Sequence, residues 1–311
     1  MQKLKQKKTW FTLGIIISIV LFANQIIKSL ERLDVITLEA RGLKYFWAAF
    51  LILVLVRGAQ MVAWRYLMLG YGVQIGFGAL FKNYTLSLLP RYLPGNVFGY
   101  LTRAEWLASS YSVGYGLTNW GSLIEACLVV SSYFEMILIY GCLQVQGWER
   151  FLLLFAVVGL PYISWCGYKI LMHNKLAIKM LNRVFNLSPE QTIIEWKIWL
   201  LVFGIYWLAW LGFGGAMRSL LLAFAAWANV GWIEHAFLFG AAWLIGFLIV
   251  FVPSGLGVRE QVYSMLLMES VGVQSGLASV MAIVSRGLIL MSELAWLLIG
   301  ILIRFVPLRR N

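Results

Sequence analysis

Six long apolar stretches constrain the fold of this chain more than any other feature. A helix that crosses a bilayer needs about 20 mostly apolar residues. Only 12% of the 311 residues are charged and 61% are hydrophobic, whereas water-soluble domains carry about 25% charged and 45–50% apolar residues. The chain is therefore predicted to be an all-α polytopic membrane protein with six full transmembrane helices. The predicted crossings are Trp10–Ile27, Tyr45–Leu69, Asn119–Leu143, Phe151–Leu171, Ile198–Ala226 and Ala278–Ile303.

The same composition excludes several classes of protein. A soluble enzyme, a disordered chain or a disulfide-stapled secreted module would not hide so much apolar surface from water. The net charge is +12, but no basic stretch with interleaved polar residues predicts a nucleic-acid surface. The three cysteines and two histidines show no metal-ligand spacing, and no nucleotide-binding or hydrolase motif occurs. We expect no metal, no cofactor and no enzymatic activity.

Two further apolar regions are interrupted by proline and glycine. The first, Phe77–Ser109, is broken at residues 89–96, and the second, Ala236–Met268, at residues 252–257. Proline removes a backbone donor and glycine admits unusual backbone angles, so each region should form two short helices joined by irregular backbone. Such backbone is tolerated at membrane depth only inside protein or beside a wet cavity. Each region can be a re-entrant hairpin or a single broken crossing.

The distribution of basic residues favours the two hairpins. With both hairpins in place, the N-terminus, the 169–197 connection and the C-terminus share one side of the membrane. That side then carries 12 basic residues and the other side carries 5, which follows the positive-inside rule if both termini are cytoplasmic. We therefore expect one integral membrane domain, residues 1–311, in the cell inner (plasma) membrane.

The two breaks resemble each other, which indicates an internal repeat. Each half of the chain, about 9–143 and 151–304, then reads as crossing, crossing, hairpin, crossing. An odd number of crossings reverses the second half, so inverted repeats are predicted. Interrupted helices at matching places in such halves are typical of a transport site near the membrane midplane. The similar residues are 92–97 and 251–256, followed by Arg103 and Glu105 in the first copy and by Arg259 and Glu260 in the second.

An anion-binding site is predicted where the helices restart after the breaks. The free N–H groups and positive dipole end of a helix N-terminus favour a negative group. Arginines would bind a headgroup, backbone at the breaks would form its cradle, and glutamates would orient the cations. The candidates are the cations Arg57, Arg91, Arg103, Arg259 and Arg286, the cradle residues Pro94, Gly95, Asn96, Pro253, Ser254, Gly255 and Gly257, and the carboxylates Glu105, Glu260 and Glu293.

A purely structural interpretation of these residues stays open at this point. The prolines can simply kink buried helices, with each arginine paired to the adjacent glutamate, and buried ion pairs also fix helix register. An arginine near the bilayer centre, such as Arg57, costs about 2.5–3.5 kcal/mol on insertion scales and must face protein or water. We expect Glu125 and Glu135 to be the carboxylate partners of Arg57 and Arg286.

The second break and the helix beyond it resemble a known family. Residues 252–260, VPSGLGVRE, with the Ser-Arg-Gly of residues 285–287, are similar to the Pro-x-Gly-Gly-Leu-Gly-x-x-Glu signature and downstream arginine of the lysylphosphatidylglycerol synthase transmembrane family, also called the flippase-like domain family. Residues 93–103 are similar to the first Pro-Gly segment of that family. Ser254 stands where the family usually has glycine, and Asn96 where a small residue is common.

The resemblance implies a polytopic bundle that moves amphiphilic lipids between leaflets, either aminoacylated phosphatidylglycerol or polyprenyl-phosphate-linked sugars. In larger members a soluble aminoacyl-transferase domain follows the membrane part, and we expect none here because the sequence ends at Asn311, directly after the last crossing. We therefore expect a flippase or transporter whose partners are anionic, phosphate-bearing membrane lipids. The alternative is a non-transporting membrane partner that positions a separately encoded lipid-modifying or glycosyltransferase enzyme.

Overall fold

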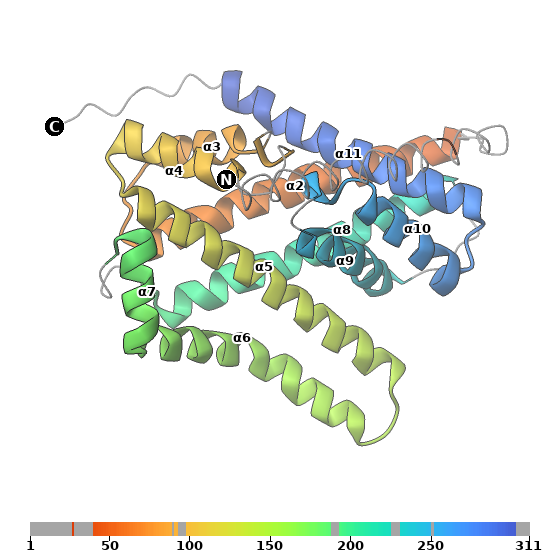
Figure 1. The fold of residues 1–311 in the computed structure, drawn as a ribbon. Coiled ribbons are helices and arrows are strands. Elements are labelled where there is room, and N and C mark those ends of the chain that lie inside the picture. Colours follow the sequence, from red (N-terminus) through yellow and green to blue (C-terminus); the bar gives the residue numbers. More distant parts are fainter. Residues whose placement is uncertain are drawn as a thin grey trace, which may run out of the picture. The chain divides into compact units, whose positions relative to one another are not determined.

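The computed structural model describes residues 27, 40–88, 90–92, 98–187, 193–224, 231–249 and 252–302. All regular structure in these residues is helical (Figure 1), which confirms the predicted all-α class for this part of the chain. In chain order the helices are α2 (Ala40–Gly70), α3 (Phe77–Leu86), η2 (Pro90–Tyr92), α4 (Phe98–Tyr111), α5 (Tyr115–Gln144), α6 (Glu149–His173), α7 (Lys175–Phe185), α8 (Trp196–Phe224), α9 (Trp232–Leu248), η4 (Pro253–Gly255), α10 (Val258–Val271) and α11 (Ser275–Leu302).

Five of these helices, α2, α5, α6, α8 and α11, are long and apolar enough to cross a membrane. They confirm five of the six predicted crossings, by length and composition, and the protein is a multi-pass membrane protein. Helices extend beyond the apolar runs because polar residues can continue a helix; α6, for example, starts at Glu149, where a negative charge favours the helix N-terminus. The predicted crossing Trp10–Ile27 lies outside the described residues except for Ile27.

Each interrupted region forms two short helices. Helices α9 and α10 pack together. A hydrogen bond connects α3 to α4: the side-chain Nδ2 of Asn83, on α3, donates to the backbone carbonyl of Arg103, on α4, at 2.9 Å. The element order of long helix, short pair, long helix occurs twice, as α2–α5 and as α8–α11. The predicted helix–break–helix regions are therefore present, and their re-entry into the membrane stays a prediction.

The break between α9 and α10 depends on backbone conformations that favour glycine. Ser254, Gly255 and Gly257 have φ values of 50°, 69° and 81°, in the left-handed region where a Cβ is strained. A Cβ on Gly255 would also lie 3.0 Å from the Cα of Gly246, near the end of α9. The break is thus held directly against α9 with no side chain between the two backbones.

Replacing Gly255 by alanine is expected to destabilise the protein more than the same change at Gly272. Gly272 has a φ of 71°, but no atom lies within 4 Å of the position that a Cβ would take, so Gly272→Ala adds only backbone strain, about 1–2 kcal/mol. Gly255→Ala adds the collision with Gly246, about 1–3 kcal/mol more. Thermal unfolding in detergent measures the difference, and equal losses for the two variants would contradict the close packing of the break on α9.

The described residues form two compact units. Unit 1 contains α2 up to Val56, η2, α8 from Trp210, the α9–α10 pair and α11 up to Ser292. Unit 2 contains α2 from Arg57, the α3–α4 pair, helices α5 to α7, and the remaining parts of α8 and α11. Unit 1 therefore holds α9, α10 and the break between them, unit 2 holds α3 and α4 from Gly99, and each unit has its own group of buried charged side chains.

Candidate functional site

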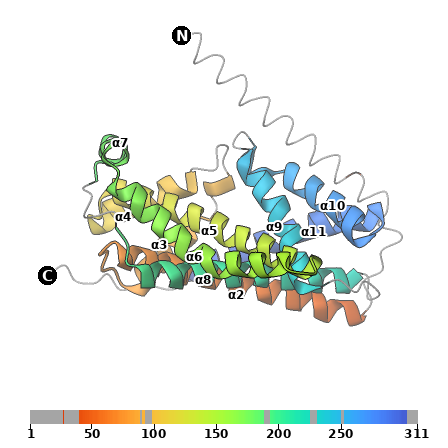
Figure 2. The same cartoon turned by 90° about the horizontal axis from the view of Figure 1, so that it is seen from below.

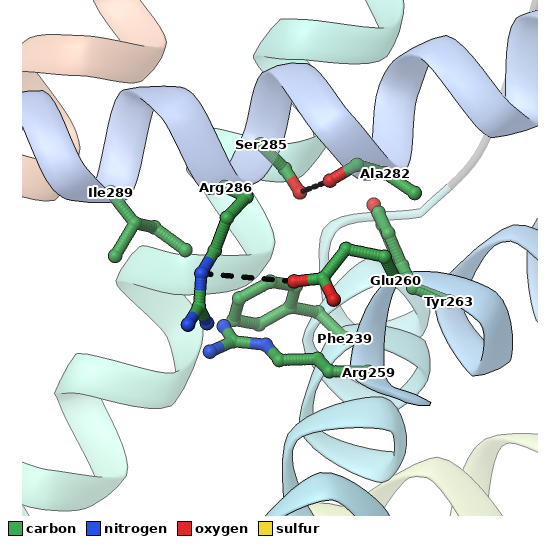
Figure 3. Close-up of a pocket in the computed structure, with 8 residues that line it drawn as sticks. All are labelled: Phe239, Arg259, Glu260, Tyr263, Ala282, Ser285, Arg286 and Ile289. Atoms are coloured by element: carbon green, nitrogen blue, oxygen red, sulfur yellow. Dashed lines mark hydrogen bonds and ion pairs between the residues drawn. The ribbon is translucent and has the colours of Figure 1, made fainter. Parts of the chain in front are cut away.

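A pocket in unit 1 is formed by side chains of α9, α10 and α11 (Figure 3). The α10 residues lie in its first two turns, and the α11 residues are spaced i, i+3, i+4 and i+7, which places them on one face of the helix. The pocket is closed in this conformation, with no room for a water molecule between its walls. Its lining residues are Phe239, Arg259, Glu260, Tyr263, Ala282, Ser285, Arg286 and Ile289.

Two guanidinium groups point toward the same part of this pocket (Figure 3). Arg259 stands over the ring of Phe239, with its Cζ 4.6 Å from the ring centroid, a distance at which a cation is attracted to the ring. Arg286 is buried, and its Nη2 donates to the carbonyl oxygen of Ser254 at 3.3 Å. The backbone of the break therefore positions one cation, and an aromatic side chain of α9 positions the other.

The carboxylate of Glu260 has two roles in the pocket. Its Oε2 accepts a hydrogen bond of 2.6 Å from the backbone N–H of Gly257, so it caps the N-terminus of α10. Its Oε1 lies 3.7 Å from Nε of Arg286. The eight lining residues carry two guanidinium groups and this single carboxylate, which is a formal excess of one positive charge. Guanidinium groups bind oxyanions through charge-assisted hydrogen bonds, so this arrangement is suited to an anion.

Two hydroxyl groups add hydrogen-bonding capacity to the pocket. Tyr263 is fully buried, its ring meets Phe239 edge-to-face at 5.6 Å, and its hydroxyl has no hydrogen-bond partner among the described residues. Ser285 donates to the carbonyl of Ala282 at 2.8 Å, which leaves its oxygen lone pairs as acceptors. The pocket thus combines cations with a phenol that can donate to an oxyanion.

Unit 2 contains a corresponding arginine, Arg103, on α4. Its guanidinium group stands over the rings of Tyr84 and Trp64, with Cζ 4.2 Å and 4.5 Å from their centroids. Its Nε donates to the hydroxyl of Ser87 at 2.9 Å, and its Nη1 forms a salt bridge with Glu125 of α5. Arg103 is 1% exposed, so this cation is enclosed and neutralised by the protein itself.

The two arginine sites are built on one plan. In each unit, the arginine of the restarted helix stacks on an aromatic ring of the short helix before the break, as Arg103 does on Tyr84 and Arg259 on Phe239. These pairs are separated by 19 and 20 positions in the sequence. Such matching contacts support an internal repeat more strongly than the similarity of the break sequences alone.

The next long helix makes the two sites different. In unit 2, α5 supplies the carboxylate of Glu125, which also accepts a 2.6 Å hydrogen bond from the hydroxyl of Tyr206. In unit 1, α11 supplies the guanidinium of Arg286 at nearly the same distance from the helix start. The unit 2 site therefore sets a carboxylate of the long helix against its arginine, whereas the long helix of unit 1 adds a second guanidinium group to a pocket lined by Arg259 and Glu260. This contrast identifies the unit 1 pocket as the candidate binding site.

The prediction that Glu105 orients Arg103 is wrong. Glu105 is exposed on α4, and Arg103 pairs with Glu125 instead. Residues two apart in a helix point in nearly opposite directions, so the buried side of α4 that carries Arg103 cannot also carry Glu105. Glu260, one residue after Arg259, faces the pocket only because it caps the helix that begins there.

Glu125 and Glu135 are not the partners of Arg57 and Arg286, but Glu293 and Glu260, which were predicted to orient the cations, do contact them. Nη2 of Arg57 lies 2.6 Å from Oε1 of Glu293, and its Nη1 donates to Gln60 at 2.8 Å. Glu125 serves Arg103, and Arg286 pairs with Glu260. Arg57 and Glu293 form a buried pair in unit 2 and are not among the residues that line the unit 1 pocket.

The remaining predicted site residues have mixed outcomes. Arg91 lies half-buried in η2 and does not line the pocket. At the second break, Pro253 begins η4, and Ser254, Gly255 and Gly257 support the pocket through their backbones. The cradle residues of the first break lie outside the described residues; they are Pro94, Gly95 and Asn96.

Sequence reasoning did not identify Phe239 or Tyr263 as pocket residues. Tyr263 follows Arg259 by four positions, the spacing that places two residues on one face of a helix, so this signal was available. Phe239 lies on α9, on the other side of the break, and no sequence pattern relates it to Arg259. Among the residues that the structure describes, no group of three or more His, Cys, Asp or Glu side chains could hold a metal ion.

A comparison with protein families gives one match. The family model described as the lysylphosphatidylglycerol synthase TM region matches residues 9–296. Neither a curated protein nor a solved structure matches the chain. The family match includes both helix–break–helix pairs and therefore both arginine sites.

Proposed function

Because this chain belongs to the lysylphosphatidylglycerol synthase transmembrane-region family, we propose that it moves an anionic, phosphate-bearing lipid between the leaflets of the cell inner membrane. The observation that supports this most is the unit 1 pocket, where Arg259 and Arg286 face one buried space at the start of α10. The lipid is of the aminoacyl-phosphatidylglycerol or polyprenyl-phosphate-linked type. The chain carries the lipid and does not modify it chemically.

The physical requirement for such a carrier is to shelter a phosphate from hydrocarbon. A bare ion of this size would face a Born cost of order 20 kcal/mol in a medium of low dielectric constant. Guanidinium groups bind phosphate through paired, charge-assisted hydrogen bonds, and the N-terminus of α10 adds backbone N–H groups and a favourable dipole. Two arginines at a helix start are therefore the kind of site that a phosphate headgroup needs. The acyl tails can remain in the lipid.

The closed state of the pocket implies a conformational step. Arg259 is half-buried and is held over Phe239 by a ring contact, whereas Arg286 is buried between Ser254 and Glu260. We propose that the half-buried Arg259 moves toward an arriving phosphate while the buried Arg286 stays in place.

The proposed transport path uses the two helix–break–helix pairs as re-entrant hairpins of inverted repeats. The repeated element order and the matching arginine–aromatic contacts support this arrangement. Movement of one repeat against the other would expose the headgroup site to each leaflet in turn, as in other proteins with broken helices at matching positions. Both termini are cytoplasmic in this topology.

Reconstitution of the purified protein tests the proposal. Vesicles are prepared with labelled phosphatidylglycerol or with labelled galactosylceramide, which has a polar headgroup but no phosphate, and a reducing agent outside destroys accessible label. We expect the protein to speed the loss of inner-leaflet phosphatidylglycerol and to leave galactosylceramide unchanged. Acceleration of neither lipid, with an enzyme that co-purifies in stoichiometric amount, would instead favour the non-transporting membrane partner.

A further inference from the structure

Helix α7 is a separate, well-capped helix at the end of a membrane span. Only Asn174 separates it from α6, and the Oδ1 of Asn174 accepts hydrogen bonds from the backbone N–H groups of Leu176 and Ala177 at 2.9 Å and 3.3 Å. At its other end, Asn186 adopts a φ of 53°, which is typical of a helix C-terminus. In unit 2, α7 runs across the directions of α5 and α6, and Figure 2 shows it nearly end-on.

The neighbouring span ends place α7 at the border of the membrane. Tyr168, near the end of α6, stacks on Trp199, near the start of α8, with ring centroids 4.8 Å apart. The two ends therefore lie together on one side of the bilayer. Trp196 at the start of α8 is exposed, and Lys169 stands over the ring of Trp165. Exposed tryptophan and lysine side chains are typical of the level of the lipid headgroups.

One face of α7 packs on the protein. Leu181 and Phe185 are half-buried against the core of unit 2, and the ring of Phe185 meets Trp120 edge-to-face at 5.8 Å. The carbonyl of Phe185 lies so close to Gly116 of α5 that a Cβ at position 116 would collide with it. The orientation of α7 about its own axis is therefore fixed by these contacts.

The other faces of α7 are an apolar stripe and a basic stripe, both exposed. Leu176, Met180 and Val184 are 69%, 60% and 67% exposed, and their i, i+4, i+8 spacing aligns them along the helix. Lys175, Lys179 and Arg183, one position earlier in each turn, form a parallel basic stripe. The 11 residues of α7 include no acidic residue.

We propose that α7 lies in the membrane–water interface and binds the anionic lipids of the leaflet at the end of α6. An interfacial helix buries its apolar face about 5–10 Å deep at the boundary of headgroups and acyl chains, while lysine and arginine side chains meet anionic headgroups. The apolar stripe of α7 lies beside the basic stripe, as such a position requires. At the membrane surface the apolar stripe can contact acyl chains while the basic stripe contacts anionic headgroups. This role does not depend on lipid transport.

Quenching by brominated lipids tests the position of α7 in the full-length chain. The free cysteines, Cys127, Cys142 and Cys166, are replaced by alanine, and a fluorophore is attached through Met180→Cys or, as the matched control on the polar side, Asn182→Cys. In vesicles of equal parts phosphatidylglycerol and phosphatidylcholine, acyl-chain bromine should quench the label at position 180 at least about twofold more than the label at 182. Equal quenching would overturn the interfacial position, as would protection of position 180 by a second copy of the chain.

The choice between anionic and zwitterionic lipid is tested with the same label. With bromine on phosphatidylglycerol alone, quenching at position 180 should exceed that with bromine on phosphatidylcholine alone by at least about twofold. The variant Lys175→Gln, Lys179→Gln, Arg183→Gln should bring this ratio close to one while position 180 remains quenched. A ratio of one in the protein with its basic stripe intact would overturn the proposed binding of anionic lipid. Neither quenching measurement depends on lipid flipping. The interfacial position of α7 can therefore be refuted while the proposed transport function holds, and the transport function can be refuted while the position of α7 holds.

Discussion

The double replacement Arg259→Ala and Arg286→Ala is expected to slow phosphatidylglycerol movement in reconstituted vesicles by about 100-fold or more. Each hydrogen bond to a charged group contributes about 1.5–3 kcal/mol net, and 1.4 kcal/mol corresponds to a factor of ten. Removing both cations from the pocket also leaves the carboxylate of Glu260 buried without a cationic partner from α11, which repels a phosphate. The rate of label loss from the inner leaflet measures the effect.

Two further variants separate headgroup binding from a general effect of charge. Arg259→Lys keeps the positive charge but loses the planar fork, so movement should fall about tenfold. Arg150→Ala removes an exposed arginine at the start of α6 and should leave the rate unchanged. If the double alanine variant folds and moves the lipid as fast as the original chain, the pocket is not the headgroup site.

Replacing Glu125 by alanine should destabilise the protein strongly without acting on the transport site. The change leaves the guanidinium of Arg103 buried between Trp64 and Tyr84 without its carboxylate. Breaking a buried ion pair in this way costs about 3–5 kcal/mol. Thermal unfolding in detergent measures the loss, and Glu105→Ala, at an exposed position on α4, should change stability by no more than about 0.5 kcal/mol.

A compensated variant shows whether the unit 2 site is structural. Arg103→Met combined with Glu125→Leu removes both charges, and such replacements of a buried pair are often neutral or stabilising. We expect this double variant to recover most of the stability and to move phosphatidylglycerol at the original rate. A stable double variant that no longer moves the lipid would show that Arg103 binds the headgroup.

The two arginine sites share one contact and differ in another. Both sites place an arginine over an aromatic ring on the preceding short helix. In unit 2, Glu125 lies against the arginine and accepts a hydrogen bond from Tyr206, so these side chains form a buried polar cluster. Unit 1 places Arg286 at the corresponding position and keeps a positive pocket. Glu125 and Arg286 thus take corresponding positions in the two sites, and we propose that a lipid phosphate binds beside Arg259 and Arg286 in unit 1.

The fold was largely predictable from local patterns in the sequence. About 20 consecutive apolar residues indicate a crossing whatever surrounds them, and five of the predicted crossings are helices of sufficient length. Proline and glycine indicate a break because each changes the conformations that its own backbone can adopt, whatever surrounds it. Gly255, for example, has a φ of 69°. The departure of Ser254 from the glycine of the family was also visible, and the structure gives it a φ of 50°, a conformation that glycine adopts without strain.

The partners in the buried charge clusters could not be predicted in this way. Glu125 meets Arg103 of the preceding helix and Tyr206, which lies 81 positions further along the chain. Only the packing of these helices decides which carboxylate serves which cation. Sequence reasoning named Glu260 and Glu293 among the carboxylates that orient the cations, but it expected Glu125 and Glu135 to be the partners of Arg57 and Arg286. The basic residues of α7 were used only for the sidedness of the membrane, although the helical spacing of Leu176, Met180 and Val184 was readable.

Mass spectrometry of the lipids that stay bound to the purified protein tests the central claim most directly. The protein and its Arg259→Ala, Arg286→Ala variant are extracted from the same membranes, and the lipids released by each are identified and counted. We expect the original chain to retain a phosphate-bearing anionic lipid in near-stoichiometric amount and the variant to lose it, with other lipids unchanged. Retention of the same anionic lipid by both proteins, in equal amount, would contradict a headgroup site at these two arginines.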